Sequence, residues 1–439
     1  MISRYQQDLD FVTSALEDGY IFLGIKEKEW GYPFEEVKRA FEQRLSKITS
    51  DLGFWLLLRE LVASLHDGHT GIGLDAAGIT RPYPSILPFE IKDIAGQYYV
   101  SGWRDDTSSV REIEIGDEVI SIGGFTTEAL LQIYERYQGA STRASLPKAV
   151  AQGPHVIFNY FLPHYDFDAP LALSLLSGDG KQKRCQIPWV SVPKKAANPS
   201  PTNFVSYRWL RQDPRLAYLR MRDFYFPGRE NVQTIKEHLN TIFSEIREAE
   251  GVLLDIRHND GGTPTPFFDV ISRLIQDPLP NFKRRWLISG SFLKYHDYRY
   301  RFADRKGLTE WEFDGSPGRE TIVPSPEYRL SKGVSIVIMV DWATCSRAEQ
   351  LPVMFREAGI ATIFGERTSG ADACPLRISL PSTGWRFSFS VGECRSAKGY
   401  NIEGNGVIPD VPFICSPEDL GAQRDRHLEE AEHLLLELI

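Results

Sequence analysis

The stretch from Val334 to Gly370 constrains the fold of this chain most strongly. It opens with an apolar, β-branched run at residues 334–340, which has the length and composition of a buried strand. A helix is expected to start at about Ser346 and to end near Gly359, before a second buried strand at residues 360–364. A crossover of this kind joins parallel strands with right-handed connectivity. The sequence therefore predicts an α/β core with a parallel-rich sheet.

Ser346 is expected at the first turn of that helix, just past the carboxyl end of a strand. Open α/β sheets bind their ligands at this edge, and the N–H groups of a helix N-terminus favour negative charge. A nucleophile and part of an oxyanion hole would fit this position. A serine that only caps its helix is the commoner occurrence, so this stretch alone does not decide between the two.

A second unusual segment, His66-Asp67-Gly68-His69, follows a predicted helical region at residues 1–65. Glycine permits a sharp turn, and the unperturbed pKa of histidine suits a general base near neutral pH. His69 is therefore a candidate base, whereas His66 is expected to support structure. A histidine that only interacts with the dipole at a helix C-terminus is an equally open interpretation.

A glycine-rich loop follows a third buried strand, predicted at residues 251–256, and opens a helix from about Pro264. Such a loop can bind an anion, but its spacing matches neither the P-loop nor the dinucleotide-binding pattern, and no lysine is placed to hold a phosphate. The N–H groups of Gly261 and Gly262 suit an oxyanion instead, and an ordinary turn without chemistry stays an alternative. Hydrogen bonds and an ion pair are expected to brace the loop through Asp255, Arg257 and Asn259.

The 439 residues suit several domains. We predict an N-terminal helical cap at residues 1–75, a mainly β domain at 80–191, a linker rich in Pro, Ser, Asn and Lys at 192–211, and an α/β core with a closing C-terminal helix at 212–439. In the second part, Gly116-Asp117 followed by Gly123-Gly124 resembles the PDZ fold, in which a sheet edge captures an extended peptide.

Composition restricts the partners. The net charge of -9 argues against a nucleic-acid partner, and no apolar run approaches the roughly 18 to 20 residues that span a bilayer. The N-terminus lacks the basic and then apolar pattern of a signal peptide, so the protein is expected in the cytoplasm, or in the periplasm or outside the cell if a signal was removed. Five cysteines without C-x-x-C spacing support neither a metal site nor a cofactor.

Four motifs follow one another along the chain: LHDGHT at residues 65–70, LLDIRHNDGG at 253–262, TCSRAE with FGERTSG between 344 and 370, and EGNGVIPDV at 403–411. In this order they resemble the C-terminal-processing (tail-specific) serine peptidases and their relatives, the tricorn protease core and the modules of interphotoreceptor retinoid-binding protein. The resemblance implies a crotonase-like core with Ser346 as nucleophile. It also implies an oxyanion hole made by the N–H of Arg347 and by a glycine N–H at Gly261 or Gly262.

One departure from the processing peptidases concerns the base. In that branch a lysine in the loop after the second strand activates the serine, and the aligned position here is Ala371, with no lysine between Lys332 and Lys398. What remains resembles the tricorn branch, which implies His69 as the base and Glu403 as the residue that orients the system. Tricorn has a serine just before its histidine; here that position is Gly68, so the bridging hydroxyl is missing.

The resemblance implies a serine peptidase that cleaves peptides or unfolded proteins through an acyl-enzyme. A ligand-binding protein on the same fold is one alternative, because the retinoid-binding relatives have that role. An esterase is the other, since the same nucleophile would cleave an ester more easily than an amide. The sequence carries no indication of an oligomeric state.

Overall fold

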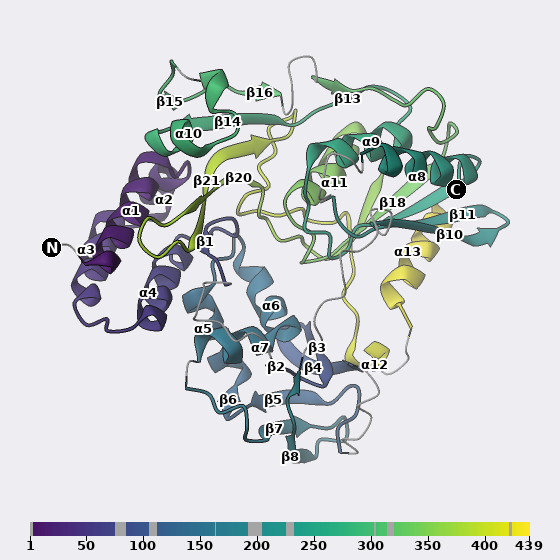
Figure 1. Ribbon diagram of the computed structural model, residues 1–439. Helices are drawn as coiled ribbons and strands as arrows, with labels where there is room; N and C mark the ends of the chain where they lie inside the picture. Colours follow the sequence, from purple (N-terminus) through teal and green to yellow (C-terminus); the bar gives the residue numbers. More distant parts are fainter. Residues whose placement is uncertain are drawn as a thin grey trace.

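The computed structural model describes residues 3–74, 85–104, 112–162, 164–191, 204–224, 232–302, 304–313, 320–420 and 424–439. These residues form helices and several sheets, one of them parallel-rich, in distinct parts of the chain (Figure 1). The predicted α/β multidomain class is confirmed. None of the described helices is long and apolar enough to cross a membrane.

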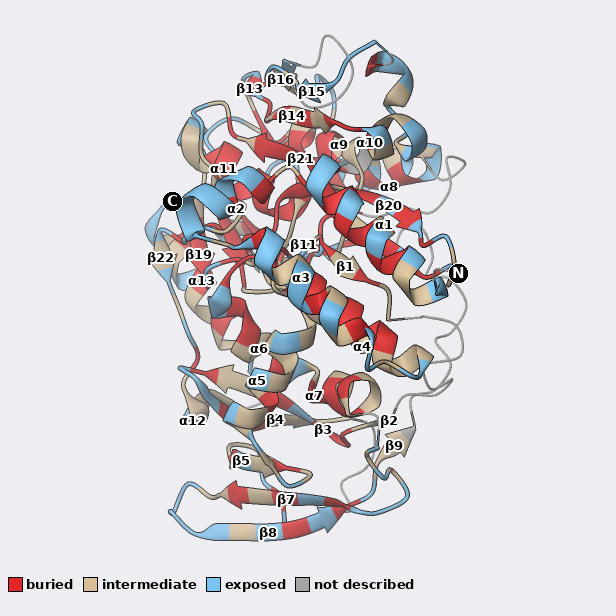
Figure 2. Cartoon of the chain, turned by 90° about the vertical axis from the view of Figure 1, so that its left-hand side faces the viewer, coloured by how far each residue is buried: buried red, intermediate tan, exposed pale blue. Residues whose placement is uncertain are grey.

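The N-terminal region is helical, as predicted, and lies on the left in Figure 1. Its helices are amphipathic, with buried inner faces and exposed outer faces (Figure 2). Ser3 and Ser50 cap two of them by accepting backbone N–H groups in the first turn. The helices are α1 (Arg4–Gly19), α2 (Leu23–Trp30), α3 (Phe34–Leu45) and α4 (Asp51–Ala63).

A mainly β unit occupies the bottom of Figure 1. Its sheet has the order β3-β4-β5-β7-β8, with β6 paired to β5, and all of its pairs are antiparallel. Helix α5 follows β6 directly, and α6 packs on β3. The strands are β3 (Phe89–Ile94), β4 (Gln97–Trp103), β5 (Glu118–Ile122), β6 (Phe125–Thr126), β7 (Leu171–Leu176) and β8 (Gln182–Ile187); the helices are α5 (Thr127–Tyr137), α6 (Leu146–Gln152) and α7 (Pro154–Val156).

Only part of the predicted linker, residues 192–211, can be followed. Residues 192–203 lie outside the described residues, as do residues 76–79 between the first two predicted parts. From Val205 to Gln212 the chain forms strand β10, which pairs with β11 (Arg215–Met221). The alternating apolar residues of β10 lie next to polar and charged ones, which is why its composition resembled a linker.

The central sheet of the C-terminal part has the order β10-β11-β12-β18-β19-β22. All neighbours except β10 and β11 pair in parallel. Successive residues of its strands face opposite sides: Val252 and Leu254 pack with the helices α8, α9 and α11, whereas Leu253 packs with α13. The new elements are β12 (Gly251–Asp255), β18 (Ser335–Val340), β19 (Thr362–Gly365), β22 (Val411–Pro412), α8 (Val232–Glu245), α9 (Pro264–Leu274), α11 (Arg347–Ala358) and α13 (Arg426–Glu437).

A further sheet, β1-β21-β14-β15 with β20 and β16 at its sides, joins the N-terminal helices to the core. Helix α1 packs against α10 and β21, so distant parts of the chain share one hydrophobic cluster. The predicted closing C-terminal helix corresponds to α13, which the short helix α12 (Pro417–Leu420) precedes. The other elements are β1 (Gly71–Ile72), β14 (Lys283–Ile288), β15 (Gly307–Leu308), β16 (Glu312–Phe313), β20 (Ala373–Ser379), β21 (Arg386–Arg395), α10 (Gly290–Tyr295), β2 (Ser85–Ile86) with β9 (Val190–Ser191), and β13 (Leu279–Pro280) with β17 (Thr321–Ile322).

Candidate active site

Two loops meet at the carboxyl ends of β12 and β18. These strands are parallel neighbours, with Asp255 paired to Met339, so the segments that follow them emerge side by side. The hydroxyl of Thr344 donates to the carbonyl of Ile256 at 3.1 Å, and the N–H of Cys345 donates to the carbonyl of Asn259 at 2.9 Å. The glycine-rich loop and the turn before Ser346 are therefore fixed to each other.

Ser346 is the N-cap residue of α11, as the sequence predicted, and its backbone is strained. Its φ of 57° and ψ of -129° lie in a region that residues with a side chain rarely adopt. Strain of this kind persists where the surrounding structure fixes the backbone, and it is common at active sites. The conformation separates Ser346 from an ordinary helix-capping serine, whose backbone is extended.

Glu349 holds the strained turn in place. Its side chain is fully buried and accepts the N–H of Ser346 at 2.9 Å, of Gly370 at 2.7 Å and of Ala371 at 3.1 Å, together with the hydroxyl of Thr368. Burial raises the pKa of Glu349 to about 8, against the opposing effect of these donors. The loop after β19 is thereby attached to the turn that carries Ser346.

Gly261 packs directly against the start of α11. A Cβ at this position would lie 2.8 Å from the nitrogen of Arg347 and 2.8 Å from the carbonyl oxygen of Cys345, and its φ is +85°. The N–H of Gly261 donates to Oδ1 of Asn259 at 2.9 Å. Among the described residues the N–H of Gly262 has no partner, so Gly262 is the better placed of the two predicted glycine donors.

Asp255, Arg257 and Asn259 brace the loop from behind. Asp255 is fully buried, and its carboxylate is 2.7 Å from the guanidinium of Arg257. Arg257 also pairs with Asp425, the N-cap residue of α13, at 2.7 Å. The sequence predicted that hydrogen bonds and an ion pair brace the loop, and these contacts, with the hydrogen bond from Gly261 to Asn259, are of that kind.

His69 lies between the end of α4 and the short strand β1. The backbone N–H of His69 donates to the carboxylate of Asp67 at 2.8 Å, and its backbone carbonyl accepts the hydroxyl of Ser388 at 2.7 Å. Asp67 also accepts the hydroxyl of Ser390 at 2.8 Å. Because both serines belong to β21, which pairs with β1, that sheet fixes the histidine loop.

The imidazole of His69 is held in a largely neutral state near pH 7. Burial lowers its pKa below 6.5, the charge of Arg377 lowers it further, and the charge of Asp67 opposes both. Its Nδ1 atom is buried and has no hydrogen-bond partner among the described residues. One nitrogen of His69 and one oxygen each of Asp67 and Glu403 lie within 4.8 Å of one another, a spacing that would also admit a metal ion.

Glu403 lies beside Asp67 and His69. Its carboxylate accepts the N–H of Asp372 at 2.8 Å. Burial and the charge of Asp67 raise its pKa well above the ordinary range, and a hydrogen bond from Ser141 and the charge of Lys26 oppose that shift. Lys26 is itself buried, and burial lowers its pKa. Two close carboxyl groups therefore share a buried environment with one cation.

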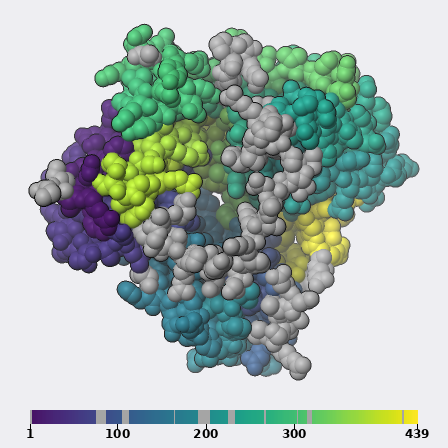
Figure 3. Space-filling model, in the orientation of Figure 1, coloured from purple at the N-terminus to yellow at the C-terminus, as the bar shows by residue number. Residues whose placement is uncertain are grey.

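A cavity of about 650 Å³ contains both Ser346 and His69 in its lining. Gly261, Gly262 and Arg347 line it as well, whereas Glu403 and the three supporting residues do not. In Figure 3 the parts of the molecule meet around a hollowed centre. The aromatic segment that follows β13 forms part of the cavity wall through Trp286, His296 and Tyr298.

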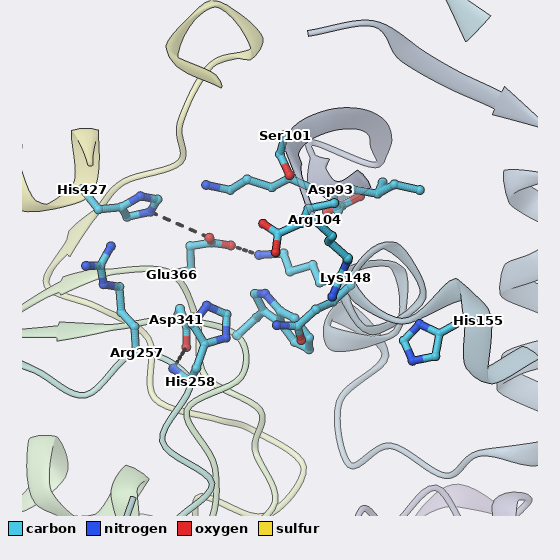
Figure 4. A pocket seen from close by; sticks show the side chains of 15 residues that line it. Asp93, Ser101, Arg104, Lys148, His155, Arg257, His258, Asp341, Glu366 and His427 are labelled. Carbon is cyan, nitrogen blue, oxygen red and sulfur yellow. Dashed lines mark hydrogen bonds and ion pairs between the residues drawn. The ribbon is translucent and has the colours of Figure 1, made fainter. Parts of the chain in front are cut away.

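A second cavity, of about 380 Å³, lies between the mainly β unit and the core (Figure 4). Lys148 of α6 forms an ion pair with Glu366, and the ring of His258 lies 3.1 Å from the carboxyl group of Asp341. Burial lowers the pKa of His427 to about 3, so this wall carries a neutral imidazole. The pair of Lys148 and Glu366 joins the mainly β unit to the core across this cavity.

The model of peptidase family S41 matches residues 215–413, the segment that carries the glycine-rich loop and Ser346. The C-terminal part of the chain, which carries the candidate nucleophile, therefore matches peptidase family S41. Among solved structures the chain is similar to mature CPAF, with a TM-score of 0.74 and 19% identity over 98% of this chain and 96% of that one. Mature CPAF complexed with lactacystin matches with a TM-score of 0.72 and 18% identity, over 98% and 97% of the two chains. At this identity the likeness shows a common fold.

A curated relative matches part of the chain. The Chlamydia pneumoniae protein CPj1016/CpB1054 is 22% identical over 268 residues, which are 49% of this chain and 43% of that protein. The chain thus matches less than half the length of this curated relative.

Some residues of the site were not identified from the sequence. Asp67 was noted only as an acidic neighbour in the His-containing motif, and nothing in the sequence indicated Lys26 or Ser141. Ala371, aligned with the lysine of the processing peptidases, lies next to the histidine loop: a Cβ on Gly68 would be 3.1 Å from its methyl group. The assignment to the tricorn branch stays a prediction.

Proposed function

We propose that this protein is a serine peptidase in which Ser346 is the nucleophile and His69 the general base. The observation that carries the proposal is that a serine on a strained helix start and a histidine with a lowered pKa line one cavity. A helix cap alone requires neither the strain nor the histidine. An unprotonated imidazole can accept the serine proton near neutral pH.

In the proposed reaction the hydroxyl oxygen of Ser346 attacks a peptide carbonyl, and its proton passes to His69. The backbone N–H groups of Arg347 and Gly262 stabilise the negative charge that develops on the carbonyl oxygen. His69 then protonates the leaving amine as the C–N bond breaks, which leaves an acyl-enzyme on Ser346. Water, deprotonated by His69, hydrolyses the ester and restores the serine.

The carboxyl groups of Asp67 and Glu403 are assigned to the support of His69. Asp67 binds the backbone of His69, and its charge favours the imidazolium that forms during the reaction. Glu403 lies within 4.8 Å of the ring in the same cluster. Glu403, whose pKa is raised by burial and by the charge of Asp67, is proposed to orient the cluster from beside the imidazole.

The proposed substrates are peptides and unfolded proteins. The cavity of about 650 Å³ is wide enough for several side chains, and both acidic and basic residues line it. An extended chain can enter such a cavity, whereas a folded protein would have to present a loop.

Hydrolysis of a denatured protein and of a matched peptide ester should be measured for the wild type and for Ser346→Ala. The wild type is expected to cleave both substrates, with loss of at least about 1,000-fold in kcat in the variant and an unchanged melting temperature. Peptide cleavage by the variant at the wild-type rate would refute the assignment. Cleavage of the ester alone would favour an esterase.

A further inference from the structure

A short segment of the mainly β unit enters the candidate active site. Residues 138–142 connect α5 to a 3₁₀ turn at Arg143–Ser145. Ser141 and Thr142 are buried, with 8% and 5% of their surfaces exposed. Ser141 contacts the histidine loop, and Thr142 contacts the loop held by Glu349.

The contacts of this segment are close on both sides. Thr142 donates its hydroxyl to the carbonyl of Ser369 at 2.9 Å, and a Cβ on Gly370 would be 2.4 Å from the methyl group of Thr142. On the other side, a Cβ on Gly139 would be 2.9 Å from the carbonyl oxygen of Asp67. Glycine at positions 139 and 370 is what allows the segment to fit between the two loops.

The hydroxyl of Ser141 has two partners in the site. It accepts the backbone N–H of Gly68 at 2.9 Å. It also makes a hydrogen bond with the carboxyl group of Glu403. A hydroxyl has one hydrogen and two lone pairs, so the bond from Gly68 leaves its hydrogen available for the carboxylate. Ser141 thus connects the residue before His69 to the carboxyl group beside the imidazole.

The glycine at position 68 makes room for this arrangement. A Cβ there would lie 3.4 Å from the hydroxyl oxygen of Ser141, so the hydroxyl occupies the space beside the missing side chain. The sequence indicated that no hydroxyl precedes His69. In the structure the hydroxyl of Ser141, a residue 73 positions after Gly68 in the chain, lies at that point.

We propose that Ser141 is a positioning residue of the peptidase site, whose hydroxyl bridges the N–H of Gly68 and the carboxyl group of Glu403 and so fixes that carboxyl group beside His69. The inference rests on the proposed function of Ser346 and His69. It implies that the mainly β unit supplies part of the active site, beyond any role in binding substrate.

The test compares Ser141→Ala with Ser145→Ala, a matched control. Ser145 is also 8% exposed, but its hydroxyl donates to the carbonyl of Thr142 at 2.8 Å and does not reach the histidine loop. Peptide hydrolysis is measured against pH, with rates normalised to folded protein from thermal melts. Ser141→Cys, whose thiol is a weak donor, replaces the alanine variant if that one does not fold.

Ser141→Ala is expected to lower kcat by about 10- to 100-fold with KM within twofold, since the residue acts on the base and not on the substrate. The pH profile of activity should also change, because the carboxyl group of Glu403 beside His69 loses a donor that favours its charged form. Ser145→Ala should retain the wild-type kcat and pH profile.

Equal kcat and equal pH profiles for the two variants, in an active wild type, would overturn the role of Ser141 alone. A wild type that neither cleaves peptides nor reacts with a fluorophosphonate at Ser346 would overturn the proposed function, and with it the role of Ser141. The two failures are therefore distinguishable.

Discussion

At the scale of single residues, the turn at Ser346 depends on one buried carboxyl group. Glu349 accepts donors from Ser346 itself and from the loop that contains Thr368, Gly370 and Ala371. A buried carboxyl group with several partners is costly to disturb, because each donor would lose its acceptor in a buried environment. Ser346, the proposed nucleophile, and the loop after β19 are thereby coupled through one side chain.

The raised pKa of Glu349 predicts a pH dependence of stability. Its folded-state pKa is about 8 against 4.5 for the free side chain, so the folded state holds the proton more tightly. Its contribution to stability is fully present below pH 4.5 and is lost as the pH rises through about 8, with a slope of at most about 1.4 kcal/mol per pH unit. Glu349→Gln, which does not titrate, should lack this slope. Urea unfolding at several pH values checks it, and parallel curves for the two proteins would contradict it.

Arg377 predicts a shift in the pH dependence of activity. Its charge lowers the pKa of His69, although the side chain itself is exposed. Removing the charge in Arg377→Gln should raise the pKa of His69, so the acid limb of kcat/KM moves to higher pH. Arg377→Lys keeps the charge and should keep the wild-type profile. The account of His69 as base fails if the glutamine variant shows no shift, or one toward lower pH.

At the scale of elements, the strands and helices around Ser346 followed from periodicity and from glycine positions. The helix expected from about Ser346 to Gly359 is α11, and the strands expected on either side of it are β18 and β19. Local patterns suffice there because buried parallel strands are continuous apolar runs. Strand β10 was missed because its side chains alternate with charged residues next to a Pro-rich stretch.

The site was predictable only where its residues belong to recognisable motifs. Ser346, His69 and the two glycines stand in such motifs, and they line one cavity. Ser141 stands in none, because its role depends on a contact between segments 73 residues apart. Contacts of this kind follow from tertiary packing, which a single sequence does not display.

The close approach of the glycine-rich loop to α11 can be tested with two glycines of equal φ. Gly261 and Gly124 both have a φ of +85°, but only a Cβ at Gly261 would meet other atoms. Gly261→Ala is expected to displace the N–H of Arg347 and to lower kcat by at least about 100-fold. Gly124→Ala should lose only about 1–2 kcal/mol of stability through backbone strain, with kcat unchanged. Equal kcat values in the two variants would refute the proposed packing at the oxyanion hole.

At the scale of the whole molecule, the active site lies where three parts of the chain meet. The N-terminal helices lead into His69, the central sheet carries Ser346, and the mainly β unit contributes Ser141. An ion pair between Lys148 of α6 and Glu366, at the start of the loop that Glu349 holds, joins two of these parts (Figure 4). Its side chains are largely buried, with 19% and 8% exposed.

This ion pair predicts an energetic coupling between the mainly β unit and the core. Lys148→Ala and Glu366→Ala should each destabilise the protein, because each leaves a charge without its partner. In a double-mutant cycle the coupling is expected at about 1–3 kcal/mol, measured by chemical denaturation. Strictly additive effects would show that the two parts are not joined through this pair.

The most direct test of the account is labelling with a fluorophosphonate, which reacts with activated serines, followed by mass spectrometry of the modified peptides. The wild type, Ser346→Ala and His69→Ala should be compared, each confirmed as folded. We predict modification of Ser346 in the wild type, none in Ser346→Ala, and a loss of at least about 100-fold in labelling rate in His69→Ala. Labelling of Ser346 at the same rate without His69, or modification at a different residue, would contradict the assignment of the Ser346–His69 pair.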